Sequence, residues 1–262
     1  GLDDKKSITL SALVELFFWA TAWLVVIADE NTLRQNTLSP RMSHGNTVAL
    51  YISNTLYGIV FRVLYEEFKE DNKKLAELIK YFSTNFHLIN RAQAIDVLLS
   101  KKKVEEVTIE EYMSLIEGTT GVDIASTICM GAVISGFDEK TTNSLWKFGI
   151  ELGTLAQIRD DVLDYCDVKY EDEYVIGKIP FRDIETEKKR LPLLITRDVK
   201  QRNLSGDVYA KIENDFIIPR KKKAIKNLEE SVIPKNTKNT LKRILDYLSD
   251  IRIFQYFMLP RQ

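Results

Sequence analysis

The sequence of 262 residues contains only two cysteines, two histidines, six prolines and eleven glycines. Cys129 and Cys166 cannot form a disulfide framework, so a reducing compartment is expected, with the cytoplasm as the expected location. His44 and His87 do not cluster with the cysteines, which excludes the usual zinc sites. The scarcity of glycine and proline disfavours collagen-like, low-complexity and turn-rich all-β architectures.

The chain also lacks an excess of charge of either sign. Its 37 Lys and Arg residues nearly balance 38 Asp and Glu residues, giving a net charge of -1. A nucleic-acid partner is therefore not expected, because such partners usually require a basic surface. Hydrophobic residues make up 45% and charged residues 29%, which is typical of a folded globular protein. No linker or repeat divides the chain, so residues 1–262 are expected to form a single domain.

The longest apolar run, at 16–28, is thirteen residues without a charge, LFFWATAWLVVIA. A membrane-spanning helix needs about 20 apolar residues, and shorter runs are more often buried core helices. No small-residue cleavage site follows the run, so it does not resemble a signal peptide. A core helix is expected, with a membrane role as the alternative.

Apolar spacing of the 3.6-residue type predicts one helix after another. Helices are expected at 7–28, 47–70, 73–99, 121–136, 141–165 and from 191 onward, with loops at 29–46 and 169–190. Thr108 followed by Glu111 fits a capping box and predicts the start of a further helix. No convincing strand pattern is present, so the fold class is all-α, with about ten helices.

An acidic stripe is the first sign of chemistry. Gln157, Asp160, Asp161 and Asp164 recur at i, i+3, i+4 and i+7, which places them on one helix face. Carboxylates beside an open site suit Mg²⁺, which keeps its waters and is shared with substrate phosphates. A solvated acidic face is the alternative interpretation.

Basic residues follow the acidic stripe on a segment that could fold back over it. These are Lys178, Arg182 and Lys188. Acid-held Mg²⁺ facing basic side chains is an arrangement that can clamp a diphosphate. The alternative is an ordinary charged surface loop.

Together these motifs resemble the trans-isoprenyl diphosphate synthase (polyprenyl synthetase) family. The family's glutamine, second Asp-Asp-x-x-Asp motif, Gly-Lys element, aspartate, lysine and Leu-Pro pair correspond to Gln157, Asp160, Asp161, Asp164, Gly177, Lys178, Asp183, Lys188, Leu191 and Pro192. Upstream matches are Arg34, Gln93, Asp96, Tyr112, Thr120 and Gly121. The resemblance implies an isoprenoid synthase fold of about ten helices around a central apolar cavity, an Mg²⁺ cofactor held by Asp160, Asp161 and Asp164, and a homodimer.

The departures from the family pattern are equally informative. The first Asp-Asp-x-x-Asp motif falls on 25–29, where only Asp29 remains and Val25 and Val26 replace two acids. Thr119 stands in place of a lysine, Gln35 in place of a second arginine, and Arg190 in place of a threonine. The chain shows no counterpart of the family's N-terminal Gly-Lys-Arg element.

The family residues that are replaced or absent here mostly contact one of the family's two substrates, the acceptor. In the family, the Gly-Lys-Arg element and the second arginine bind isopentenyl diphosphate, the acceptor. The matches that remain imply a site for the allylic donor, with Asp160, Asp161 and Lys178 as catalytic residues. Donor contacts are expected from Arg34, Gln157, Lys178, Lys188, Gln93 and Asp29. The valines suit an acceptor without a diphosphate, such as a lipid-like or aromatic molecule.

Three activities are compatible with this pattern. The first is an Mg²⁺-dependent prenyltransferase that uses an acceptor other than isopentenyl diphosphate, as in the atypical subgroup resembling the moenomycin-pathway prenyltransferase and archaeal homologues. The second is a silent or regulatory subunit of a heteromeric synthase, and the third is a terpene synthase. If the acceptor is a lipid, the basic run 221–223 could favour contact with a membrane surface.

Donor length is expected to depend on the residues four and five places before the first acidic motif, which line the chain tunnel in the family. These are Thr21 and Ala20, and both are small. The tunnel is then expected to continue one turn further to Phe17, since residues at i and i+4 share a face. Each isoprene unit matches about one helical turn of ~5.4 Å, so a farnesyl-sized or longer donor is expected.

Overall fold

The computed structural model describes residues 4–29, 33–34, 37–165, 169–170, 173–174, 181–200 and 203–252. Within these ranges the chain is helical, apart from two short antiparallel pairs, β1 (Leu33–Arg34) with β2 (Thr37–Leu38) and β3 (Lys169–Tyr170) with β4 (Glu173–Tyr174). The predicted all-α fold class is confirmed.

The helical elements follow one another closely along the chain. They are α1 (Asp4–Ala28), α2 (Pro40–His44), α3 (Asn46–Phe68), α4 (Asn72–Ser100), η1 (Val104–Glu106), α5 (Ile109–Ile116), η2 (Glu117–Gly121), α6 (Val122–Ile134), α7 (Glu139–Leu163), α8 (Arg182–Glu185), α9 (Leu191–Thr196), α10 (Gly206–Ile212), η3 (Glu213–Ile217), α11 (Ile218–Glu230) and α12 (Lys235–Leu248). Here η1 is a 3₁₀ turn, while η2 and η3 are π-helical. The long predicted helices are all present. The segments expected to be loops, 29–46 and 169–190, each contain a short strand pair and a short helix, α2 in the first and α8 in the second.

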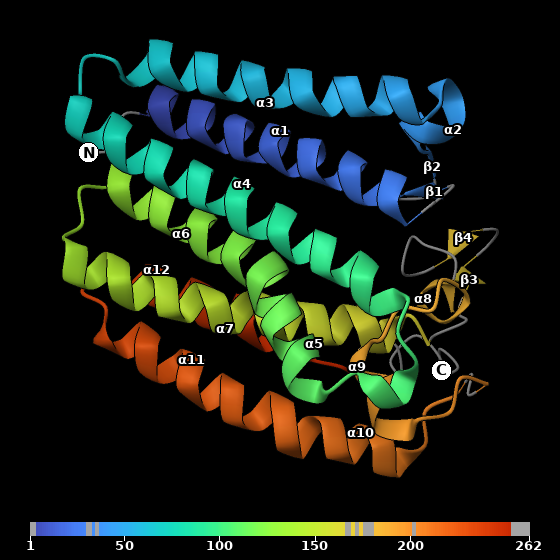
Figure 1. Ribbon diagram of the computed structural model, residues 1–262. Helices are drawn as coiled ribbons and strands as arrows, with labels where there is room; N and C mark the ends of the chain where they lie inside the picture. The colour runs from blue at the N-terminus through green and yellow to red at the C-terminus, as the bar shows by residue number, and fades with distance from the viewer. Residues whose placement is uncertain are drawn as a thin grey trace.

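The long helices lie alongside one another as a bundle (Figure 1). The C-terminal ends of α1, α4 and α7 lie at the same end of the bundle, where α2, α8 and the two short strand pairs also gather. Residues that end these three helices are therefore brought together, although they are far apart in the sequence.

Local capping fixes where several helices begin. Thr108 Oγ1 accepts a hydrogen bond from the Glu111 backbone N–H at 3.1 Å, and Glu111 Oε2 accepts one from the Thr108 N–H at 2.9 Å. The predicted capping box is thus confirmed at the start of α5. Asp71 and Asp138 cap α4 and α7 by accepting a hydrogen bond from the N–H three residues on.

Two apolar clusters form the core. One surrounds α7, with Phe148, Leu155 and Ile158 fully buried. The other joins α1, α3 and α4 through residues such as Phe17 and Phe82. The apolar helix α1 is therefore part of a core, as expected for the 16–28 run. Both α1 and α3 are also long and apolar enough to cross a membrane, by length and composition only, and about a third or less of the most apolar stretch of each helix is buried.

Two glycines allow α7 to lie very close to its neighbours. A Cβ placed on Gly149 would lie 2.4 Å from the Ala125 Cα of α6, and one on Gly153 would lie 2.2 Å from the Thr120 carbonyl oxygen. Real Cβ atoms do not approach backbone so closely, so only glycine permits this contact. The close approach fixes the position of the half of α7 that carries the acidic stripe.

Replacing Gly153 by alanine is predicted to lower the free energy of unfolding by about 1–3 kcal/mol or more, because the backbones of η2 and α7 must separate. Urea denaturation monitored by circular dichroism measures this. Gly131→Ala is the matched control, since a Cβ there meets nothing within 4 Å. That control is expected to be neutral or slightly stabilising, and an equally stable Gly153→Ala variant would contradict the close-packing argument.

Candidate active site

A buried ion cluster joins the ends of α1 and α4 to the segment before α9. Asp96, near the end of α4, has a side chain only 6% exposed. Its carboxylate meets Lys188 Nζ at 2.5 Å, and the same ammonium lies 2.7 Å from Asp29 Oδ1 at the end of α1. Lys188 therefore links the one aspartate left from the first acidic motif to the aspartate of the Gln-x-x-Asp match.

Arg190 completes this cluster. Its terminal nitrogens donate to both oxygens of Asp96, at 2.9 and 3.3 Å, in a bidentate pair. Its Nε lies 3.6 Å from Asp183 Oδ2 and 3.9 Å from Asp161 Oδ1. Burial opposes the charge of both partners, yet Arg190 and Lys188 hold the pKa of Asp96 below its usual value. Asp96 is therefore charged at neutral pH.

Asp161, on α7, is fully buried and surrounded by donors. The Tyr112 hydroxyl of α5 donates to Asp161 Oδ2 at 2.7 Å, and Gln157 Nε2 donates to Oδ1 at 2.8 Å. Burial raises the pKa of Asp161 to about 7, with Arg190 acting in the opposite direction and Asp183 adding to the rise.

Gln157 connects Asp161 to the π-helical segment η2. Its Oε1 accepts a hydrogen bond from Thr120 Oγ1 at 2.6 Å, while its Nε2 donates one to Asp161, four residues further along α7. The structure thus brings Gln157 and Asp161 together at the predicted i, i+4 spacing.

The other two acids of the stripe have different surroundings. Asp160 is exposed. Asp164 is only 1% exposed, and its Oδ2 accepts the backbone N–H of Asp183 at 3.3 Å. Within the described parts of the chain, no group of three or more Asp, Glu, His and Cys side chains is placed to hold a metal ion.

The remaining predicted contacts lie at the same end of the bundle or outside the described residues. Gln93 is half-buried on α4, one turn before Asp96. Arg34 belongs to β1, where the backbone alone is described. Lys178 lies outside the described residues.

The predicted tunnel residues of α1 face the apolar cluster shared with α3 and α4. Ala20 is fully buried, and Thr21 forms a hydrogen bond of 2.9 Å with the Tyr57 hydroxyl. Phe17 packs against Tyr57 and Phe82, with ring centroids 5.0 and 5.2 Å away. An aromatic layer therefore lies one turn below Ala20.

Most of these residues are predicted by the sequence, but the part played by Arg190 is not. The sequence signal for it is an additional cation, in place of the family's threonine, two residues after Lys188. The site as a whole presents carboxylates and cations at one end of an apolar helix wall. Such an arrangement can bind a ligand that has a charged group at one end and an apolar tail, with the tail lying among apolar side chains.

Replacing Tyr112 by phenylalanine is predicted to lower the free energy of unfolding by about 1–3 kcal/mol, because Asp161 loses a buried donor. Thermal or urea denaturation measures the loss. The control is Tyr247→Phe, since Tyr247 is 57% exposed, and it is expected to change little. A double-mutant cycle with Asp161→Asn tests the contact itself. The losses in the free energy of unfolding caused by Tyr112→Phe and Asp161→Asn are expected to be non-additive in the double variant, and strictly additive losses would argue against the hydrogen bond.

The sequence matches a known protein family. The sequence model described as "Polyprenyl synthetase" matches residues 2–228. A geranylgeranyl diphosphate synthase from Saccharolobus solfataricus is 26% identical over 197 residues, covering 75% of this chain and 58% of that protein. The chain thus spans little more than half the length of this curated relative.

Solved structures share the fold. A geranylgeranyl pyrophosphate synthase superposes with a TM-score of 0.78 at 24% identity, covering 94% of this chain and 81% of that chain. A geranyltransferase from Helicobacter pylori, complexed with magnesium and isoprenyl diphosphate, has a TM-score of 0.69 at 22% identity and covers 96% and 75% of the two chains. The expected isoprenoid synthase fold is confirmed, and with the family match over residues 2–228 it follows that the chain belongs to the polyprenyl synthetase family.

Proposed function

We propose that the protein is an Mg²⁺-dependent prenyltransferase that moves a prenyl group from an allylic diphosphate to an acceptor other than isopentenyl diphosphate. The observation that carries the proposal is the ion cluster of Asp29, Asp96, Lys188 and Arg190 beside Asp161. It lies where the apolar helix α1 ends, so a charged head group and an apolar chain can be held together.

In the proposed reaction, the bond between C1 of the prenyl chain and the diphosphate oxygen breaks, and the diphosphate leaves with the electron pair. The allylic cation is then attacked by a nucleophilic atom of the acceptor, which loses a proton. We assign diphosphate binding to Lys188, Lys178 and Arg34 from the family resemblance; Lys188 is paired with Asp29 and Asp96 in the structure, so it would have to exchange one of these partners for the diphosphate. Gln93 and Gln157 are assigned as polar contacts, with Asp29 at the edge of the site.

The carboxylates of α7 fit Mg²⁺ by their chemistry. Mg²⁺ is usually held by one or two carboxylates together with substrate phosphates and waters, rather than by a complete protein cage. Exposed Asp160 and its neighbour one turn on, Asp164, are suited to this role, and Asp161 lies beside them. When bound, the metal would neutralise charge on the leaving diphosphate.

The acceptor is proposed to be lipid-like or aromatic. Val26 is buried and Val25 is half-buried on α1, where acidic residues would otherwise favour a second metal-bound diphosphate. An apolar wall next to the reacting carbon also excludes water, which would quench the cation. A single domain over 1–262, a cytoplasmic location and contact with a membrane surface that supplies such an acceptor belong to the same proposal.

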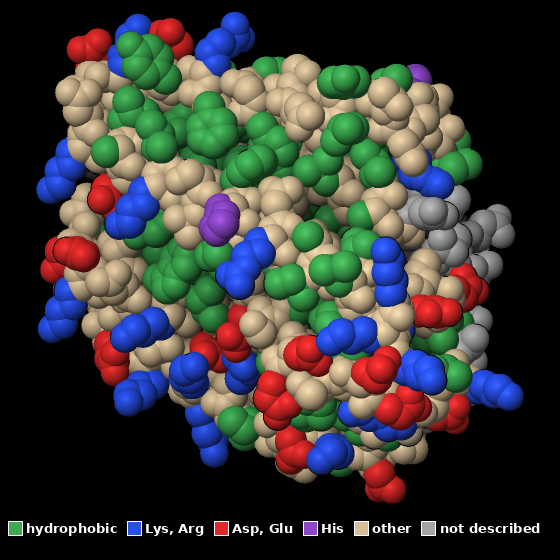
Figure 2. All heavy atoms as spheres, in the orientation of Figure 1, with side chains coloured by type: hydrophobic (Ala, Val, Ile, Leu, Met, Phe, Trp, Pro, Cys, Tyr) green, Lys and Arg blue, Asp and Glu red, His purple; other side chains and the backbone are tan. Residues whose placement is uncertain are grey.

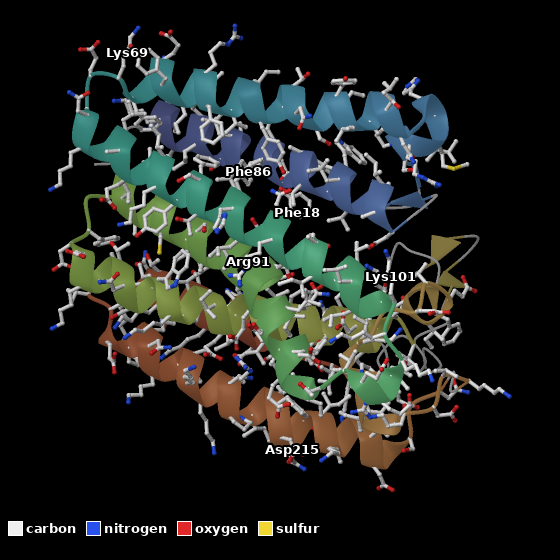
Figure 3. The ribbon with its side chains drawn as sticks, viewed as in Figure 1. Phe18, Lys69, Phe86, Arg91, Lys101 and Asp215 are labelled. Carbon is white, nitrogen blue, oxygen red and sulfur yellow. The ribbon has the colours of Figure 1, made fainter. Side chains whose placement is uncertain are left out.

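A homodimer is proposed from the apolar surface of α3 and α4. Figure 2 shows hydrophobic side chains spread over the face formed by α1, α3 and α4, and Figure 3 places Phe18 and Phe86 on it. The exposed apolar residues of α3 and α4, taken over all their faces, are Val48, Leu50, Tyr51, Tyr65, Ile79, Phe86, Ile95 and Leu98. An apolar surface of this extent is typical of an interaction site.

The activity is tested with the purified chain, Mg²⁺ and labelled geranyl, farnesyl or geranylgeranyl diphosphate. Mg²⁺-dependent release of diphosphate is expected without any partner chain, and no product five carbons longer is expected when isopentenyl diphosphate is added. Asp160→Ala should reduce release about 100-fold or more, whereas Glu139→Ala, at the exposed far end of α7, should not.

The outcomes separate the alternatives. Efficient formation of a longer diphosphate would contradict the proposed acceptor class. Absence of release with every donor would favour a silent subunit, and cyclised hydrocarbon products would favour a terpene synthase.

The proposed donor is farnesyl-sized or longer, because Phe17 lies twelve residues before Asp29, or about 18 Å along the helix. Ala20→Phe is predicted to shift the preferred donor toward ten carbons, because the new ring would fill the tunnel one turn above Phe17. Competition between labelled donors measures the shift. Ala22→Phe is the control, as it places the same ring on another face of α1; an unchanged profile in a folded Ala20→Phe variant would show that Ala20 does not line the tunnel.

A further inference from the structure

Arg190 is held in one place by the residues around it. Its side chain is 13% exposed, and its bidentate pair with Asp96 fixes the plane of the guanidinium. The remaining nitrogen, Nε, is directed toward Asp183 and Asp161. Burial opposes the guanidinium charge, but Asp96, Asp183 and Asp161 outweigh it and raise the pKa of Arg190, so the cation is permanent.

The position of this cation bears on Asp161. Asp161 is fully buried, and each of its oxygens already accepts a hydrogen bond, from Tyr112 or from Gln157. Arg190 adds a positive charge on the side of Oδ1. A divalent cation approaching Asp161 would therefore meet like charge, whereas Asp160 is exposed on the preceding position of the helix.

Charge in the cluster supports the same conclusion. Among the side chains that the structure describes, four carboxylates, those of Asp29, Asp96, Asp161 and Asp183, lie beside two cations, Lys188 and Arg190. Lys188 pairs with Asp29 and Asp96, so a neutral side chain at position 190 would remove the cation that lies beside Asp161 and Asp183. Such an excess of buried negative charge is relieved by protonation or by binding a metal ion.

We propose that Arg190 is a built-in counter-ion that competes with divalent metal for Asp161, so that it lowers the metal affinity of the acidic stripe and leaves Asp160 and Asp164 as its ligands. Arg190 is thus a positioning residue that acts through Asp161. The proposal rests on the proposed function only in assigning the α7 carboxylates to metal binding.

The test measures Mn²⁺ binding by electron paramagnetic resonance, with no prenyl donor present. Arg190→Thr is expected to bind Mn²⁺ about tenfold more tightly or better than the wild type, because a charge about 4 Å from Asp161 is removed. Arg190→Lys keeps the charge and should stay close to the wild type. Lys189→Met is the matched control, since the Lys189 ammonium donates to the backbone oxygens of Ser100 and Glu187 and to no carboxylate.

Two further measurements test the role of Arg190 if the Arg190→Thr variant is less stable than the wild type. Metal should raise the melting temperature of this variant more than that of the wild type, because binding to the folded state stabilises it. Adding Asp161→Asn should return the Mn²⁺ affinity to the wild-type range. Equal affinity in wild type and Arg190→Thr would overturn the proposal, as would tight binding that survives Asp161→Asn.

These results are independent of prenyl transfer. A protein that binds Mn²⁺ as described but releases no diphosphate contradicts only the proposed function. A protein that transfers prenyl groups normally, with Mn²⁺ affinity unchanged in Arg190→Thr, contradicts only the role assigned to Arg190.

Discussion

The largely buried carboxylate of Asp96 forms ion pairs with two cations, Lys188 and Arg190. The arrangement of the site depends on these two ion pairs. Lys188 and Arg190 both reach Asp96 from the short segment before α9, across more than ninety residues of sequence. Removing one partner of a buried ion pair leaves an uncompensated charge, which typically costs about 3–5 kcal/mol. Through this one acid, α4 determines where Lys188 meets Asp29 and where Arg190 meets Asp161.

Close backbone contact supplies the other half of the framework. Gly149 and Gly153 let α7 approach α6 and η2 at distances that no side chain allows. Thr120 is therefore near enough to bond Gln157, and Gln157 in turn orients Asp161. The glycine contacts position α7, and the ion cluster lies beside its C-terminal end, so Asp161 is held by both.

Features with a local cause could be predicted from the sequence. The Thr108–Glu111 capping box and the Gln157–Asp161 pair both follow from helix spacing, and the structure contains both. The pairing of Arg190 with Asp96, or of Thr21 with Tyr57, joins residues far apart in the chain. Spacing carries no information on such contacts, because they depend on how the helices pack. The family resemblance predicts the fold and the order of the motifs, whereas the electrostatic effect of an arginine at position 190 depends on its distance from Asp96 and Asp161 in the folded chain.

The π-helical segment η2 determines how Tyr112 and Thr120 are oriented relative to each other, so that both can form a hydrogen bond to α7. Tyr112 lies before it and Thr120 within it, and both side chains reach the same helix. A π turn accommodates one more residue than an α turn, and such turns are frequent at functional sites. A homologue with a regular α-helix here would need one residue fewer between these two positions to keep both contacts. The length of this segment, compared between aligned chains, is thus a marker of whether the Tyr–Asp–Gln–Thr connection is retained.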